Sequence, residues 1–323
     1  MGAKNTKDFN RGPDFYGERV SGKHISYHSE QISDGQPAEF LVTATGGVIT
    51  TYSHPTGGTG RMHTFTGSPT YPAAGQAFDV TQCFGSQPAE VLMVGAGGGC
   101  GAESGGGGGG LLLAPDYSLT NGLNFTVHVG LYGGPSPGGG NGTSVGSATT
   151  AFGITAGGGG GSSPPGGGGS NGGALGGNGG GGGGTWSGGG GPGGEGGAKT
   201  PVPSAFTVYG GNDGGNATAA NPYYNGWGGG GGGAGGAGGN ANQSTAATGG
   251  AGVINSITGV GITYSAGGGG NGNNVADFGS HGAQPNGTGC GCQQPSGTQS
   301  SPNSDGYPAK PGSCIIKYKW KNT

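Results

Sequence analysis

Runs of consecutive glycine are the feature that most limits how this chain can fold. Polyglycine tracts occupy residues 105–110, 157–161, 180–184 and 228–233, and glycine supplies 94 of the 323 residues. Fixing a glycine costs roughly 0.5–1 kcal/mol more than fixing an alanine, and glycine has no side chain whose burial offsets that cost. The peptide groups must compensate, because each net hydrogen bond contributes about 0.5–1.5 kcal/mol. We therefore expect an array in which nearly every N–H and C=O group is paired.

Two kinds of array satisfy this requirement. One is a stack of β-sheets; the other is a bundle of left-handed polyproline-II-type helices, which have no internal hydrogen bonds and point their polar groups at neighbours. Only glycine fits at the inward positions of such a bundle, and collagen is excluded because no strict Gly-X-Y period is present. The sequence leaves strands and helices both open for the tracts. The predicted fold class is all-β and glycine-rich, with short antiparallel strands, stacked extended polyglycine segments of polyproline-II type and no appreciable α-helix.

Three regions follow one another along the chain. Residues 1–38 form a polar N-terminal arm, 39–94 a small β region, and 95–323 a glycine-rich domain closed by a C-terminal strand. Short runs with β character, separated by turn residues, predict strands; they lie at 40–45, 48–52, 61–66, 90–94, 125–129, 254–264 and 314–320. Residues 39–94 should hold about five strands. Because hydrophobic residues make up only 29% of the chain, we expect no large apolar core.

Catalytic and ligand-binding chemistry has little support in the sequence. Charged residues make up 8% of the chain, and no spacing of its acids predicts a paired carboxylate site. The five cysteines are scattered and odd in number, so they indicate neither a disulfide framework nor a zinc site. Only three arginines exist, none in a glycine tract, and no long apolar run occurs. We expect no enzyme activity, no cofactor, no metal, no nucleic-acid partner and no membrane insertion.

An ordered series of motifs resembles a known family. The motifs are TATGGVITTY at 43–52, RMHTFTG at 61–67, EVLMVGAGGG at 90–99, FTVHVG at 125–130, FGITA at 152–156, ITG at 257–259, YSAGGGG at 264–270 and PGSCIIKY at 311–318. Together they resemble the glycine-rich domain of tail and other virion proteins of tailed bacteriophages, over residues 41–320. The composition is also similar to that of tail-fibre-tip adhesins, which stack polyglycine helices and carry variable loops at the distal end.

The resemblance implies a non-enzymatic structural protein located in the virion. A tail fibre or fibre-tip adhesin that contacts the host surface is the first expectation, with a surface glycan or outer-membrane protein as the host partner. A capsid decoration protein or head fibre is the second, and a glycine-rich structural or adhesive protein unrelated to phages is the third. A homo-oligomer, of which a trimer is the expected form, would cover exposed strand edges.

Two groups of residues are candidates for contacts with partners. Aromatic side chains among small residues favour contact with a receptor, or else cover the edge of the array or fill a subunit interface; these are Trp186, Tyr209, Tyr223, Tyr224 and Trp227. Basic and aromatic residues of the N-terminal arm are expected to dock on other virion proteins; these are Lys4, Lys7, Arg11, Phe15, Tyr16 and Arg19.

Overall fold

The computed structural model describes most of the chain beyond its first 39 residues. The described residues are 40–67, 75–101, 104–134, 144–163, 167–173, 176–182, 190–199, 204–218, 227–242, 247–270, 284–292 and 308–322. Within them all regular structure is β, and no helix is present. The strands are β1 (Val42–Thr45), β2 (Val48–Ser53), β3 (Thr59–Thr66), β4 (Gln76–Cys83), β5 (Gln87–Val94), β6 (Leu111–Leu119), β7 (Asn124–Val127), β8 (Thr149–Ala151), β9 (Ile154–Ala156), β10 (Thr207–Tyr209), β11 (Val253–Asn255), β12 (Ile262–Tyr264) and β13 (Ser313–Lys321).

Two antiparallel sheets form a sandwich at one end of the molecule. The larger sheet has the order β10-β6-β5-β13-β3-β2, and the smaller has the order β1-β4-β7. Between them lies a core that includes Phe65, Phe78, Met93, Leu112 and Ile316, all fully buried. Five strands fall between residues 39 and 94, as predicted, but β6, β7, β10 and β13 from beyond residue 94 complete the same two sheets.

The expectation that composition excludes a sizeable apolar core is wrong for this end of the molecule. The chain averages 29% hydrophobic residues, but these residues are concentrated in the strands, where they alternate between the two faces. A second apolar cluster lies on the other face of the larger sheet. There the β11–β12 hairpin packs Ile257 and Tyr264 over Leu92, Leu111 and Ile315. An average over the whole sequence therefore hides a conventional core.

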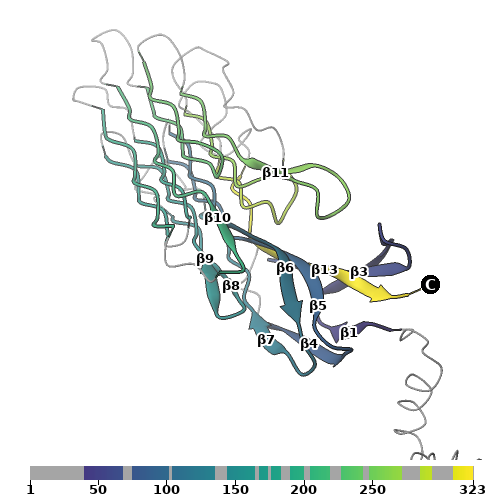
Figure 1. The fold of residues 1–323 in the computed structure, drawn as a ribbon. Coiled ribbons are helices and arrows are strands. Elements are labelled where there is room, and N and C mark those ends of the chain that lie inside the picture. The colour runs from purple at the N-terminus through teal and green to yellow at the C-terminus, as the bar shows by residue number, and fades with distance from the viewer. Residues whose placement is uncertain are drawn as a thin grey trace, which may run out of the picture.

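The predicted C-terminal strand is confirmed as β13, and it lies in the middle of the larger sheet. It pairs with β3 on one side and β5 on the other (Figure 1). Ile316 and Tyr318 face the core, while Lys317 and Lys319 lie half-buried on the opposite face. The end of the chain therefore holds together strands that come early in the sequence.

A buried histidine links β3 to β13 and to the β1–β2 turn. The Nε2 atom of His63 lies 2.8 Å from the hydroxyl of Tyr318, and its Nδ1 lies 2.7 Å from the carbonyl oxygen of Gly46. Gly46 and Gly47 have φ angles of 108° and 61°, which side chains disfavour but glycine adopts readily, so the turn can present that carbonyl. Both polar atoms of the fully buried ring are thus satisfied.

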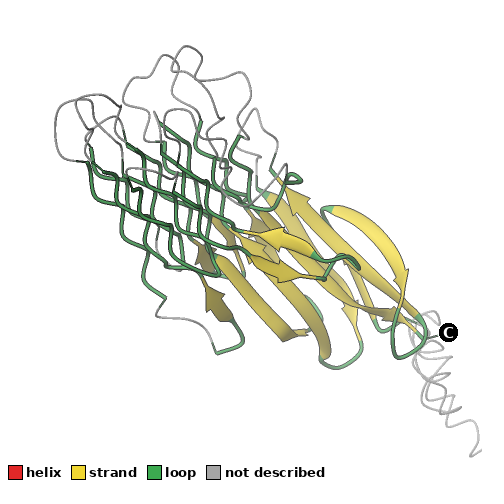
Figure 2. Cartoon of the chain, turned by 90° about the horizontal axis from the view of Figure 1, so that it is seen from above, coloured by secondary structure: helices red, strands yellow, loops and turns green. Residues whose placement is uncertain are grey.

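The glycine-rich segments form an array of extended chains beside the sandwich (Figures 1 and 2). We call the glycine array the hydrogen-bonded described segments 95–101, 104–110, 144–148, 157–163, 167–173, 176–182, 190–199, 210–217, 228–242, 247–252, 265–270 and 289–292. Nearly all of these residues lie outside strands, because their hydrogen bonds do not form two-sided ladders. The array and the C-terminus lie at opposite ends of the elongated body.

The central segment, 104–110, donates its N–H groups to three neighbours in rotation. Gly105 and Gly108 donate to 229 and 232, Gly106 and Gly109 to 292 and 289, and Gly107 and Gly110 to 160 and 157, over 2.7–3.1 Å. Its carbonyl groups accept from three further segments, 95–101, 176–182 and 265–270. Segment 104–110 is therefore surrounded by six others, is buried throughout, and repeats its bonding pattern every three residues.

Positions 105–109 of this segment have no room for a side chain, so they require glycine. A Cβ atom built at each of Gly105–Gly109 would meet a backbone carbonyl of an adjacent segment well inside van der Waals contact. Two of the five carbonyls belong to Asn178 and Ser265, and the others belong to glycines. Since backbone atoms cannot move aside as the end of a side chain can, any residue larger than glycine would push the segments apart.

Candidate interaction surfaces

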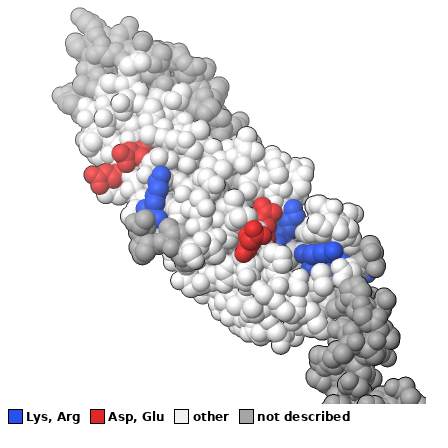
Figure 3. Space-filling model, in the orientation of Figure 1, with Lys and Arg blue, Asp and Glu red and all other residues white. Residues whose placement is uncertain are grey.

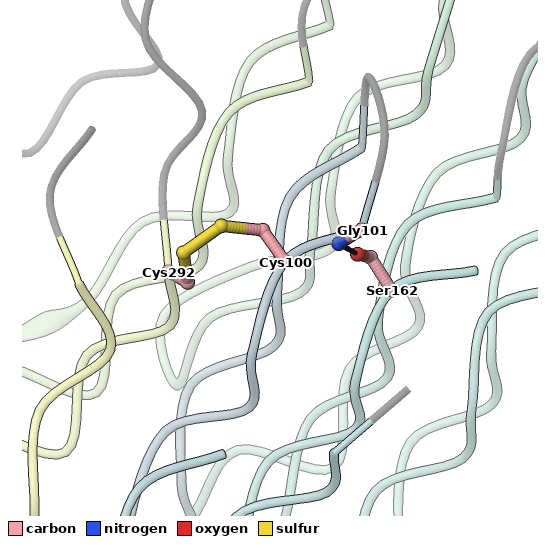
Figure 4. The surroundings of a disulfide bond; sticks show 4 residues. All are labelled: Cys100, Gly101, Ser162 and Cys292. Atoms are coloured by element: carbon pink, nitrogen blue, oxygen red, sulfur yellow. Dashed lines mark hydrogen bonds between the residues drawn. A yellow bond between two sulfur atoms is a disulfide. The ribbon is translucent and has the colours of Figure 1, made fainter. Parts of the chain in front are cut away.

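The far end of the glycine array is the first surface that could meet a partner. The chain leaves β5 at Val94 and reaches Gly101 seven residues later, so Cys100 and Gly101 lie at the end away from the sheets. Here a disulfide joins Cys100 to Cys292, which are 192 residues apart in sequence (Figure 4). The N–H group of Gly101 donates to the hydroxyl oxygen of Ser162 on the neighbouring segment. A disulfide and a hydrogen bond thus connect neighbouring segments at this end of the array.

The disulfide is a feature that sequence reasoning missed. Cys100 and Cys292 are both buried, and Tyr132 and Ala309 pack against them. Among the other cysteines, Cys290 and Cys314 are buried thiols and Cys83 is half-buried. Desolvation raises the pKa of all three, so none is a reactive thiolate at neutral pH. Glycine on both sides of Cys100, and directly before Cys292, was the only local sign that they belong to the array.

Asparagine and aspartate side chains accept hydrogen bonds from backbone N–H groups in the outer layer of the array. The side-chain oxygen of Asn216 accepts from the N–H group of Gly193 at 2.9 Å, and that of Asn240 accepts from the N–H group of Asn216 at 2.7 Å. Asn171 and Asp213 do the same for residues 195 and 196. An outermost segment lacks a neighbour on one side, and a short side chain supplies the missing acceptor. The exposed polar groups here therefore serve the fold.

Two of the five candidate aromatic residues lie in the described part of the chain. Trp227 is only 6% exposed and packs against Ala241 and Ala247. At this exposure the indole has little surface free for a receptor, and its place on the array agrees with the alternative of covering the array's edge. Tyr209 ends β10, half-buried against the apolar cluster beneath the β11–β12 hairpin.

The remaining candidates lie outside the described residues. These are Trp186, Tyr223 and Tyr224 among the aromatic residues, and Lys4, Lys7, Arg11, Phe15, Tyr16 and Arg19 in the N-terminal arm. The structure brings none of them to a described site. Their roles stay predictions.

Charged side chains are sparse, and on the face in Figure 3 they form separate small groups on an otherwise uncharged surface. Other charged residues lie on the larger sheet near the C-terminus, where Arg61 pairs with Tyr318 and so lies on the face opposite to Lys317. Lys317 lies 4.0 Å from Glu90, its ammonium group lies 4.9 Å from the ring of Tyr52, and the guanidinium of Arg61 stacks 3.6 Å from the ring of Trp320. Burial, helped by Glu90, raises the pKa of Tyr52 to about 12. These cations are engaged within the sheet.

The outer edge of the larger sheet is the second exposed surface. Its last strand, β2, is exposed on both faces, with Val48 66% and Ile49 42% exposed. The strand VITTYS contains no charged residue and no proline. Natural edge strands usually carry such residues to prevent pairing with other chains, so an edge without them is available for a partner.

Within the described residues, no group of three or more His, Cys, Asp or Glu side chains is placed to hold a metal ion. A search of the same part of the chain for a helix long and apolar enough to cross a membrane finds none. No protein-family model and no curated protein matches the sequence.

Proposed function

We propose that this chain is a non-enzymatic structural protein of a tailed-bacteriophage virion, and specifically a tail fibre or fibre-tip adhesin whose glycine array faces the host. The observation that carries the proposal is the packing of segment 104–110 among six neighbours. That packing is what stacked polyglycine helices require, and the adhesins that this composition resembles are built from such helices. The ordered series of family motifs supports the same assignment.

The proposal includes the conformation of the array. Polyproline-II helices have three residues per turn and no internal hydrogen bonds, so the three residues of a turn can hydrogen-bond to three different neighbouring segments. The rotation of donors with a period of three along residues 105–110 agrees with that geometry. A β-strand would instead alternate with a period of two. We therefore propose that the array segments are polyproline-II-type helices.

Such a module is suited to display at the tip of a particle. Its backbone groups bond to one another, its surface carries few charges, and a disulfide closes its far end. Segments of this kind give proteases little unpaired backbone to bind. We propose that the N-terminal arm docks on the virion and that loops at the far end meet a host glycan or outer-membrane protein.

The experiment that tests this function is localisation of the protein on intact particles by immunogold labelling or cryo-electron microscopy, combined with host adsorption of particles lacking it. Density at the tail or fibre tip, together with lost adsorption, is the expected result. Density spread over the capsid would favour a decoration protein or head fibre. Absence from every particle would contradict the virion assignment and leave the glycine-rich adhesive protein of another origin.

A further inference from the structure

The edge strand β2 offers unused backbone hydrogen-bonding groups. The N–H group of His54 donates to the carbonyl of Gly58 at 3.0 Å, which makes these two residues a hydrogen-bonded pair of the β2–β3 ladder. Bonded pairs alternate along an antiparallel ladder. The backbone groups of Val48, Thr50 and Tyr52 therefore point at β3, and those of Ile49, Thr51 and Ser53 point away from the sheet.

Among the described sheets, β2 is the longest edge strand. It has six residues, whereas the opposite edge, β10, has three, and the edges of the smaller sheet, β1 and β7, have four each. Pairing of β2 would hide Val48 and Ile49, two of the most exposed large apolar side chains of the described chain. The outward backbone groups of β2 and its exposed Val48 and Ile49 side chains thus face solvent without a partner strand.

We propose that β2 pairs antiparallel with β2 of a second copy of this chain, about a two-fold axis at Thr51. With this register all three outward-facing residues are used, because Thr51 faces Thr51, and Ile49 faces Ser53, across the axis. Each such pair exchanges two hydrogen bonds, and the two larger sheets become one continuous sheet. Pro55, which has no N–H group, follows directly and limits the ladder at that end.

Charge compatibility favours a second copy as the occupant. In this register Thr50 faces Tyr52, and Val48 faces His54, so only uncharged groups meet. Desolvation, with Lys319 and Lys317 nearby, lowers the pKa of His54, which favours the neutral form of that ring. The contact is the same patch on both copies and closes after two, so this edge supports a dimer where the sequence led us to expect a trimer.

Cysteine cross-linking of the full chain tests the register. Residues of a hydrogen-bonded antiparallel pair have Cα atoms about 5.5 Å apart, a distance that a disulfide can span. Thr51→Cys should therefore form a covalent dimer under mild oxidation with oxidised glutathione. Ser53→Cys, which faces Ile49 instead of itself, should not, and the wild-type chain with its own free cysteines gives the background.

Analytical ultracentrifugation tests the association itself. Thr51→Lys places two lysines on the axis and should weaken the dimer at least tenfold, whereas Thr126→Lys, on the exposed edge strand β7, should leave it unchanged. If Thr51→Lys fails to fold, Thr51→Pro should dissociate the dimer in its place, because it removes an outward N–H group at an edge position where a strand tolerates proline. A wild-type monomer at high concentration, equal behaviour of Thr51→Lys and Thr126→Lys, or equal cross-linking by Thr51→Cys and Ser53→Cys would overturn the proposal.

Discussion

Replacing Gly107 by alanine should destabilise the protein, although alanine is ordinarily the easier residue to order. The new Cβ would lie 2.8 Å from the carbonyl carbon of Asn178 and closer still to its oxygen, on a backbone that cannot yield. Overpacking of this kind costs about 1–3 kcal/mol. Weakening the adjacent hydrogen bond from Asn178 to Gly108 adds about 0.5–1.5 kcal/mol. The smaller entropy of unfolded alanine returns about 0.4–1 kcal/mol, so the expected net loss is about 0.5–4 kcal/mol.

A matched control comes from the same array. Gly236 has an unstrained φ angle, and a Cβ built there meets nothing within 4 Å. Gly236→Ala should therefore raise the free energy of unfolding by about 0.4–1 kcal/mol through the unfolded state alone. Chemical denaturation of the two variants and the wild type, followed by circular dichroism, measures both changes. Equal effects of Gly107→Ala and Gly236→Ala would refute the reasoning that backbone contact excludes side chains from segment 104–110.

Three further changes probe other parts of the structure. Replacing both Cys100 and Cys292 by serine should lower the free energy of unfolding by up to about 5 kcal/mol, since their disulfide closes a long loop. Adding reductant during denaturation of the wild type should lower its free energy of unfolding by the same amount. An unchanged value would contradict a structural role for the disulfide. Asn178→Ala removes the hydrogen bonds that the side-chain amide makes to two neighbouring segments inside the array, and it should lower the free energy of unfolding by about 1–3 kcal/mol. The exposed Asn171→Ala should lower it by less than about 1 kcal/mol, and denaturant midpoints measure both changes. Desolvation lowers the pKa of His63 below its ordinary 6.5, so its contribution to stability is present above pH 6.5 and is lost as the pH falls, by up to about 1.4 kcal/mol per pH unit. His63→Gln should flatten the dependence of the unfolding free energy on pH between pH 7 and 5. An unchanged dependence would show that other groups cause it.

Strands with a clear alternating pattern could be predicted from sequence alone, and strands that depend on tertiary contacts could not. β3, β5 and β13 were anticipated because their apolar residues are dense and bounded by turn residues. β6 was missed, since Pro115 interrupts it and proline argues against a strand. The structure accommodates this proline at a bulge, where the register with β5 shifts between Ala89 and Val91.

The properties of the candidate residues depended on segments far away in the sequence. Trp227 is buried by Ala241 and Ala247, which no local pattern connects to it. The partner of Cys100 lies 192 residues away and is set by which segments the array brings together. The requirement for backbone pairing could be derived from the glycine content, but the choice of neighbour for each tract could not, because identical glycines carry no information about register.

Native-state hydrogen exchange, resolved by residue with NMR or by peptide with mass spectrometry, tests most directly whether the paired backbone of the array holds this fold together. If the array is a cooperative, fully bonded unit, the amides of Gly105–Gly110 will exchange only through global unfolding, as slowly as those of β13 at the centre of the sheet. Exchange of these glycines that is fast while β13 stays protected would contradict the account, because it would mean that the sandwich is stable alone and the array adds nothing to it.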